Sequence, residues 1–372
     1  RRLPDEESRR CRAQRGGHQC LRGQTVITNL RFIDGGAGRR WIAPALLGLF
    51  ATSGVCHVQA ADPAAGVAAV PVPESPQVKP TAAMMAAHAE TGLLLGIVNT
   101  GQHLVAVGGN GDIVTSPDGE RWTQVQTPVD VTLTGVAFAD ERRGWAVGHD
   151  ALILHTADGG QNWSVQSFQP DLNAPLFSVL ALDPQRALAV GAFGTLKATE
   201  DGGEHWSDIV APVITGDKLH LNAVTRLANG DLFIAGEHGL AAVSVDGRDW
   251  HKLSPPYEGS FFGALPWGSH GAIAFGLRGN IYVSDDVRAD HWQKVDAHTT
   301  SSFFGGLVLP QGEVALMGGD GEIVIVDGKG GARIVRDSSS GQGQATTYAA
   351  GIDYRNALIV VGEAGVARVS LK

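Results

Sequence analysis

Short apolar runs separated by turn residues make up most of the chain. In residues 133–168 the runs LTGVAFA, GWAVG, ALILHT and WSVQSF follow one another, each bounded by Gly, Asp or Asn. Runs of this length between turn residues predict β-strands. No part of the chain after residue 60 shows the sustained apolar period of 3.6 residues that amphipathic helices require. The pattern therefore favours an all-β protein.

The same pattern repeats along the chain. Segments such as AVGHDALILHTADGGQNW and AVGAFGTLKATEDGGEHW align on a glycine that follows an apolar pair, and seven such segments occur. The aligned glycines, 40 to 45 residues apart, are Gly108, Gly148, Gly191, Gly236, Gly276, Gly318 and Gly362. Four-stranded units of this length are typical of β-propeller blades, which bury their faces against one another. We expect residues 91–372 to form an all-β, seven-bladed β-propeller with four-stranded antiparallel blades.

The seventh unit ends at Lys372, directly after its third expected strand. A missing outermost strand leaves an open sheet edge. The apolar segment GVAAVPVP, residues 66–73, is suited to pair with that edge. We therefore expect residues 61–90 to supply an N-terminal strand that closes the ring, followed by a linker in which Met84 and Met85 pack.

Residues 1–60 have the features of an export signal preceded by an upstream extension. Two arginines precede the apolar run WIAPALLGLFATSGV, and HVQA then offers small residues before a cleavage site after Ala60. The run is short for a membrane span. We expect a periplasmic protein that is not inserted in the membrane and has lost Cys11, Cys20 and Cys56. A lipid anchor on Cys56 is the less favoured alternative, because the preceding Val55 is bulky.

The net charge of the chain limits the classes of partner that it is suited to bind. The formal net charge is −9, and without residues 1–60, which hold 10 of the 29 basic and 4 of the 38 acidic residues, it becomes −15. Such an acidic body is a poor partner for nucleic acid or anionic lipid.

An acidic octapeptide ending in tryptophan recurs, as TADGGQNW at residues 156–163 and TEDGGEHW at residues 199–206. In such a turn Gly supplies a positive φ, the Asp carboxylate accepts backbone N–H groups, and the Trp ring packs on the neighbouring sheet. Copies on several blades cannot all lie at one active site, so we assign a structural role to Asp118, Asp158, Asp201, Asp246, Trp122, Trp163, Trp206, Trp250 and Trp292.

This octapeptide resembles the Asp-box of bacterial neuraminidase repeats, which sialidases share with non-enzymatic propellers, so it indicates architecture alone. The longer phrase ADERRGWAVGHDALILHTADGGQNW, residues 139–163, resembles the photosystem II stability and assembly factor family, which has exported relatives in non-photosynthetic bacteria. The resemblance implies a seven-bladed assembly chaperone that binds membrane-protein subunits through an arginine-rich surface. Arg142 and Arg143 match that surface by position.

The residues that catalysis would need are not found in a suitable pattern. A sialidase requires three convergent arginines, a Tyr nucleophile with a Glu partner, and an Asp acid. The mature chain has few arginines, most of them beside turns, and only four tyrosines. Histidines such as His205 are spread over different blades without metal-ligand spacing. We expect no catalytic site, no metal and no cofactor.

The remaining candidates lie at one mouth of the axial channel, where the loops entering the inner strands meet the turns between second and third strands. The candidate partner-binding residues are Phe177, His220, Phe262, Phe304, Tyr348 and Arg278, with Asn222, Phe261, Phe303, His149 and His238 nearby. The repeated SFFG sequence leaves two interpretations open. Either both Phe residues of a pair anchor a partner peptide, or one enters the blade interface and the other the channel wall.

The function we expect is that of a non-catalytic, monomeric, exported propeller. It would bind an exported or membrane protein, such as an envelope exporter, as an assembly or accessory factor. The alternative is a glycosidase-like, sialidase-like or glycan-binding propeller.

The expected closing strand can be tested by deletion. Removing residues 61–80 should lower the melting temperature markedly, because blade 7 would lose its outermost strand. An unchanged melting temperature, measured by circular dichroism, would count against a closing strand in this segment.

Overall fold

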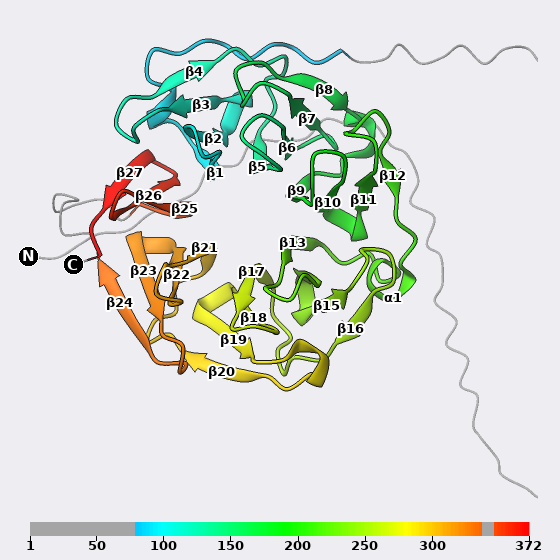
Figure 1. Ribbon diagram of the computed structural model, residues 1–372, viewed down its shortest axis with the longest axis vertical. Coiled ribbons are helices and arrows are strands. Elements are labelled where there is room, and N and C mark those ends of the chain that lie inside the picture. The colour runs from blue at the N-terminus through cyan, green and yellow to red at the C-terminus, as the bar shows by residue number, and fades with distance from the viewer. Residues whose placement is uncertain (1–78, 337–345, 372) are drawn as a thin grey trace, which may run out of the picture. The chain divides into compact units, whose positions relative to one another are not determined.

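The computed structural model describes residues 79–336 and 346–371 of the chain. These residues form seven antiparallel sheets around a central axis, and the chain travels from one sheet to the next around the ring (Figure 1). The expected all-β, seven-bladed β-propeller is therefore confirmed. No helix in the described part of the chain is long and apolar enough to cross a membrane.

In each blade the strands follow one another from the axis outward. Blade 1 contains β1 (Leu94–Asn99), β2 (Leu104–Gly108), β3 (Ile113–Ser116) and β4 (Thr123–Val125). Blade 2 contains β5 (Leu133–Phe138), β6 (Gly144–Gly148), β7 (Ile153–Thr156) and β8 (Ser164–Ser167). Blade 3 contains β9 (Leu176–Ala181), β10 (Ala187–Gly191), β11 (Leu196–Thr199) and β12 (Ser207–Asp208). Blade 4 contains β13 (Leu221–Arg226), β14 (Leu232–Gly236), β15 (Ala241–Ser244) and β16 (His251–Leu253).

The other blades follow the same plan. Blade 5 contains β17 (Phe261–Trp267), β18 (Gly271–Gly276), β19 (Asn280–Ser284) and β20 (Gln293–Asp296). Blade 6 contains β21 (Phe303–Val308), β22 (Val314–Gly318), β23 (Glu322–Val326) and β24 (Ala332–Arg336), and blade 7 contains β25 (Tyr348–Tyr354), β26 (Ala357–Gly362) and β27 (Gly365–Val369). The short helices are α1 (Pro212–Thr215), η1 (Ala89–Thr91), η2 (Gly109–Gly111), η3 (Pro170–Leu172), η4 (Ala192–Gly194), η5 (Glu237–Gly239), η6 (Leu277–Gly279), η7 (Val287–Ala289) and η8 (Gly319–Gly321).

Blades 1 and 7 meet through their inner strands, because β1 contacts both β25 and β26. Blade 7 has three strands among the described residues. Residues 66–73, the expected closing strand, lie outside the described residues, as do residues 1–60 with the expected signal. Closure by an N-terminal strand therefore stays a prediction.

The segment before blade 1 lies along the outer side of that blade. Its backbone makes the contacts: the Ala83 N–H donates to the Thr127 carbonyl (3.2 Å), and the Gln124 side-chain amide donates to the Met84 carbonyl (3.0 Å). The expectation that Met84 and Met85 pack is wrong, since their exposed fractions are 86% and 56%. Hydrogen bonds hold this segment, and the two thioether side chains face solvent.

A β-bulge opposite a glycine recurs in every blade. In blade 1, Leu94 pairs with Gly108 and Gly96 pairs with Val107, which leaves Leu95 as the extra residue. The Leu93 carbonyl oxygen then lies so close to the Gly108 Cα that an added Cβ would overlap it. The same carbonyl accepts the Gly109 N–H at 2.9 Å. Gly108 has a φ of −172°, an extended value that any residue can adopt. Glycine is therefore required here by the close approach of the carbonyl oxygen and not by the backbone conformation.

The aligned glycines of the other blades repeat this contact. A Cβ on each would overlap the carbonyl oxygen of the residue before the inner strand, and the next residue's N–H donates to that same oxygen. The carbonyls belong to Thr132, Pro175, His220, Ser260, Ser302 and Thr347. The sequence repeat of glycine therefore marks a repeated backbone contact.

The bulge divides the start of each inner strand into a buried and a channel-facing residue. The first residue is at most 3% exposed in every blade: Leu94, Leu133, Leu176, Leu221, Phe261, Phe303 and Tyr348. These side chains join the clusters that neighbouring blades share, as Phe261 does with Phe233 of blade 4. The interpretation of SFFG in which one Phe enters the blade interface and the other the channel wall is therefore confirmed.

The glycine contact can be tested with two adjacent residues. Gly318→Ala should reduce the free energy of unfolding by about 1–3 kcal/mol, since its Cβ overlaps the Ser302 carbonyl. Gly319→Ala is the matched control, because no heavy atom lies within 4 Å of its Cβ, and its effect should stay within about 0.5 kcal/mol. Urea denaturation measures both, and equal effects would contradict the close-contact explanation.

Candidate functional site: the channel mouth

The bulged residues form a ring at one mouth of the axial channel. They are Leu95, Thr134, Phe177, Asn222, Phe262, Phe304 and Ala349, one from each inner strand. All of them line an axial cavity of about 350 Å³. Because β-bulges redirect side chains out of the regular strand alternation, the fold presents one variable position per blade at this mouth, which we call the mouth ring.

Aromatic side chains occupy one side of the mouth ring. The Phe262 and Phe304 rings are stacked, with centroids 5.6 Å apart and planes at 15°, and Phe304 is 42% exposed. On blade 3, Phe177 lies 5.6 Å from the imidazole of His220. The Phe193 ring also packs against this imidazole, with centroids 5.2 Å apart. Blades 3, 5 and 6 thus carry an aromatic arc.

Phe193 was missed by the sequence reasoning. It lies at the centre of η4, has a φ of +56°, and is 55% exposed. A bulky residue in the left-handed region is a rare and strained choice, typical of functional sites. The equivalent turn positions in other blades hold Asn110, His238, Arg278 and Asp320, also at positive φ. This turn position, aligned across the repeat, is the signal that could have identified Phe193.

The cavity below the mouth ring is neutral. None of the residues that line it is ionisable, and its side-chain polar groups come from Thr134, Ser178, Asn222 and Thr225. The Asn222 amide already donates to the Phe261 carbonyl at 2.7 Å. A charged group entering this cavity would lose hydration without meeting an opposite charge. The cavity can hold an uncharged group and supplies no side chain for acid–base chemistry.

Charged groups lie around the mouth in the turns. The His220 Nδ1 lies 3.5 Å from Glu237 Oε1, and the Ser301 hydroxyl donates to Asp320 Oδ2 at 3.1 Å. Arg278 is exposed in η6. The mouth therefore combines an aromatic arc and a neutral cavity with a charged rim.

The structure brings together most of the candidates for partner binding, but not all. Phe177, Phe262 and Phe304 belong to the aromatic arc, and His220 packs against it. Asn222 belongs to the mouth ring, and His149, His238 and Arg278 belong to exposed mouth turns. Phe261, Phe303 and Tyr348 are buried between blades. The placement of Tyr348 at the mouth is corrected, because it precedes the bulge and Ala349 takes the channel position.

Arg142 and Arg143 lie at the opposite end of the blades. They belong to the turn between β5 and β6, whereas the mouth meets the start of β5. The Arg142 carbonyl accepts the Gly159 N–H at 2.8 Å, and the Arg143 guanidinium pairs with Asp140 at 3.2 Å. The two arginines and the aromatic arc therefore do not form one binding surface.

The Asp-box turns lie at this same opposite end, after the third strands of blades 1 to 5. In blade 2, Asp158 Oδ1 accepts the N–H groups of Gln161 and Asn162 at 3.1 and 2.9 Å. The Trp163 ring belongs to a cluster with Val105 of blade 1. Trp122, Trp206, Trp250 and Trp292 likewise join clusters with residues of the preceding blade around the ring.

Hydrogen bonding from the backbone lowers the pKa of the Asp-box carboxyls. The N–H groups of Arg248 and Asp249 donate to Asp246 Oδ1 at 2.8 and 2.9 Å and hold its pKa below the usual value. The His205 backbone N–H does the same for Asp201, and the N–H groups of Arg121 and Glu120 for Asp118. These carboxylates stay charged and bound to their own turns.

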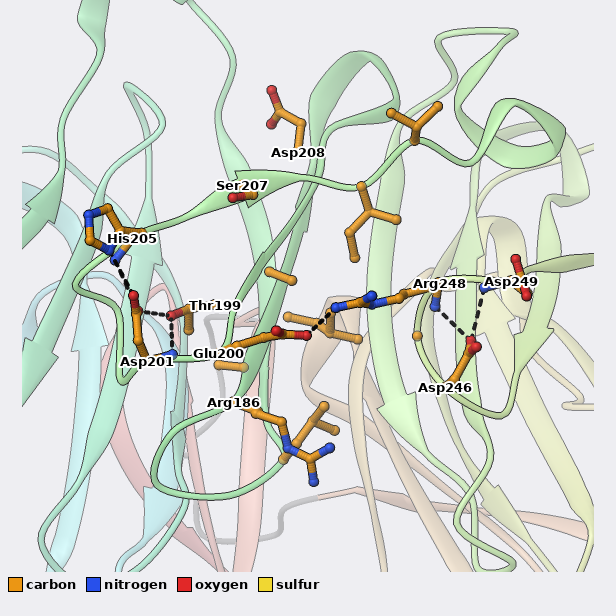
Figure 2. Close-up of a pocket in the computed structure, with 17 residues that line it drawn as sticks. Arg186, Thr199, Glu200, Asp201, His205, Ser207, Asp208, Asp246, Arg248 and Asp249 are labelled. Atoms are coloured by element: carbon orange, nitrogen blue, oxygen red, sulfur yellow. Dashed lines mark hydrogen bonds and ion pairs between the residues drawn. The ribbon is translucent and has the colours of Figure 1, made fainter.

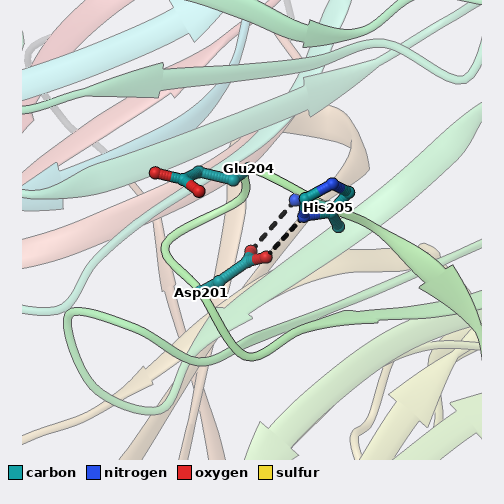
Figure 3. A group of neighbouring side chains, drawn as sticks. All are labelled: Asp201, Glu204 and His205. Carbon is teal, nitrogen blue, oxygen red and sulfur yellow. Dashed lines mark hydrogen bonds and ion pairs between the residues drawn. The ribbon is translucent and has the colours of Figure 1, made fainter.

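One Asp-box turn also gathers possible metal ligands, which the sequence reasoning did not identify. Ligand atoms of Asp201, Glu204 and His205 lie within 4.8 Å of one another (Figure 3). Asp201 Oδ2 already lies 2.8 Å from His205 Nδ1, and Glu204 and His205 are exposed. Since the Asp201 carboxylate is committed to its turn, this group is explained as part of the Asp-box.

Comparisons with known proteins agree with this architecture. A family model described as photosynthesis system II assembly factor YCF48 matches residues 114–209. Photosystem II assembly protein Ycf48 of Thermosynechococcus vestitus is 31% identical over 214 residues, which cover 56% of this chain and 60% of the relative. Photosystem II stability/assembly factor HCF136 of Cyanidioschyzon merolae is 35% identical over 72 residues, or 18% of this chain and 16% of that protein.

Solved structures give the same fold. A structure described as YCF48 bound to D1 peptide has a TM-score of 0.60 at 20% identity and covers 79% of this chain and 100% of its own. The WD40 propeller domain of Doa1 has a TM-score of 0.61 at 12% identity, covering 79% of this chain and 97% of its own. At these identities the structures establish the fold alone.

The fold and its turns define the class as a seven-bladed β-propeller of the Asp-box type. The resemblance to the photosystem II assembly factor-like propellers is confirmed by the family model and the relatives, although the chain spans only about 60% of the length of the Thermosynechococcus relative.

The Asp-box carboxylates predict an acid dependence of stability. A lowered pKa in the folded state stabilises the fold above the unfolded pKa of about 3.9, and this contribution is lost as the pH falls below it. Asp246→Asn should lower the free energy of unfolding at pH 7 by roughly 0.5 kcal/mol, because solvent screens the interactions of this exposed carboxylate, and the difference from wild type should shrink at pH 3.

Asp249→Asn is the control, since this exposed side chain accepts no backbone N–H in the described part of the chain. Urea denaturation at both pH values measures the effect. A difference for Asp246→Asn that stays constant with pH would contradict the account.

Proposed function

We propose that this propeller is an assembly or accessory factor that binds a segment of an exported or membrane protein at its channel mouth. The observation that carries the proposal is the aromatic arc of Phe177, Phe193, Phe262 and Phe304, partly exposed around a neutral cavity. Exposed, rigid aromatic groups beside a cavity are typical anchors for partner side chains.

The chemistry of the cavity favours an apolar segment as the ligand. A membrane protein that is not yet assembled exposes such segments, which later become buried in its complex. The similar YCF48 is described as bound to a D1 peptide, which supports recognition of a peptide by a propeller of this type. The proposed partner is therefore an unassembled chain, bound through an apolar side chain that enters the mouth.

We propose that the protein acts in the periplasm as a monomer, after cleavage behind Ala60. An envelope exporter is one partner of the required kind. The acidic body, with a net charge of −9 for the full chain, favours protein partners over nucleic acid. A glycosidase acting inside the axial cavity is disfavoured, because glycoside hydrolysis needs paired carboxylates and the residues lining the cavity include none.

Site-specific cross-linking in cells of the source organism tests the proposal. A photoreactive phenylalanine analogue at position 304 should cross-link to one defined exported or membrane protein. The matched control is position 308, which lies on the same strand β21, nearer the other end of the channel, with the same exposed fraction of 42%. Phe262→Ala combined with Phe304→Ala should weaken the partner's binding by roughly tenfold or more. Equal labelling from both positions, or none from position 304, would refute the proposal.

A further inference from the structure

A second cavity, separate from the channel mouth, lies between blades 3 and 4 (Figure 2). Its volume is about 540 Å³, larger than the 350 Å³ of the axial cavity. It is lined by the turn before β10, by the Asp-box turn of blade 3 and the chain that follows it, and by residues 246–249 of the blade 4 Asp-box. We call it the blade 3–4 groove.

The outer strand of blade 3 runs beside the groove and is short. Strand β12 has two residues, whereas the outer strands β4, β8, β16, β20 and β24 have three to five. After Asp208 the Ile209 N–H donates to the Leu196 carbonyl at 2.8 Å, and the chain then leaves the sheet toward α1.

Aliphatic side chains form the apolar part of the groove. Leu188 and Ile209 lie against the core, and Val210 is 85% exposed although it lines the cavity. Exposed β-branched residues beside a cavity offer apolar area that a ligand can cover.

The charges of the groove favour a cation. The residues that line it include five carboxylates and only two guanidinium groups. Both guanidinium groups already have acidic partners: Arg248 pairs with Glu200 across the groove, and Arg186 pairs with Asp183 at 2.6 Å.

Two carboxylates remain accessible to a ligand, one on each side. On the blade 3 side, Asp208 pairs with Lys197 at 2.6 Å but is still 75% exposed. On the blade 4 side, Asp249 is exposed and has no ion pair within residues 79–336 and 346–371. An acidic ligand would be repelled here, whereas a basic one would find a partner.

We propose that the blade 3–4 groove binds an extended protein segment in which a lysine or arginine stands beside a branched aliphatic residue. The aliphatic side chain covers Val210, and the cation pairs with Asp208 on the blade 3 side of the groove or with Asp249 on the blade 4 side. The groove lies at the Asp-box end of the blades and the mouth ring at the other end, so one propeller can hold two segments at once.

A random peptide library displayed on phage tests the groove. The library is selected on the Phe262→Ala, Phe304→Ala protein, which removes the mouth as a competing site. The selected peptides should combine Lys or Arg with Val, Ile or Leu. Their affinity for Asp208→Asn combined with Asp249→Asn should fall by roughly threefold or more, since the exposed ion pair is lost on whichever side of the groove it forms.

The control is Asp171→Asn, which removes an exposed carboxylate of η3, outside the groove, and should leave affinity within about twofold. Selection of acidic or charge-free peptides, no selection above background, or equal affinity for the double variant would overturn the proposal. None of these outcomes bears on cross-linking at position 304, so a failure here leaves the mouth proposal standing.

Discussion

The propeller depends on one backbone contact made in every blade. The carbonyl before each inner strand lies against the Cα of the glycine that ends the second strand, and it accepts the N–H of the next residue. Only a residue without a Cβ allows this approach. The contact fixes a bulge, and the bulge sends one side chain into the blade interface and the next into the channel. The same backbone contact therefore determines both the packing of the blades and the position of the binding surface.

This arrangement separates stability from recognition. The residues before the bulge, such as Leu94 and Phe303, are buried, so a change there alters the core. The mouth ring can vary with little effect on packing, and here it holds aromatic residues on blades 3, 5 and 6 and small ones such as Thr134 and Ala349 elsewhere. The Asp-box turns stabilise the opposite end by keeping their carboxylates bound to backbone N–H groups. A fold of near-identical blades thus carries an asymmetric site.

Much of this could be predicted from the sequence. The glycine spacing predicted the blades, and the SFFG pairs pointed to the mouth. The register of the inner strands, however, could not be predicted from the sequence. Strand alternation does not reveal where a bulge interrupts it, so Tyr348 and Phe304 looked equivalent although Phe304 is the bulged residue of its strand and Tyr348 precedes the bulge of its own. Phe193 was missed because its positive φ depends on a turn that composition does not disclose. The blade 3–4 groove is lined by turns of two neighbouring blades, a tertiary arrangement that no local pattern discloses.

Amide hydrogen exchange followed by nuclear magnetic resonance tests the central contact most directly. The relevant N–H groups follow the aligned glycines, at Gly109, His149, Ala192, Glu237, Leu277, Gly319 and Glu363. If the contact maintains the fold, these amides should exchange only through global unfolding, as slowly as those of central strands such as β6. Exchange from these positions that is orders of magnitude faster than from β6 would contradict the account.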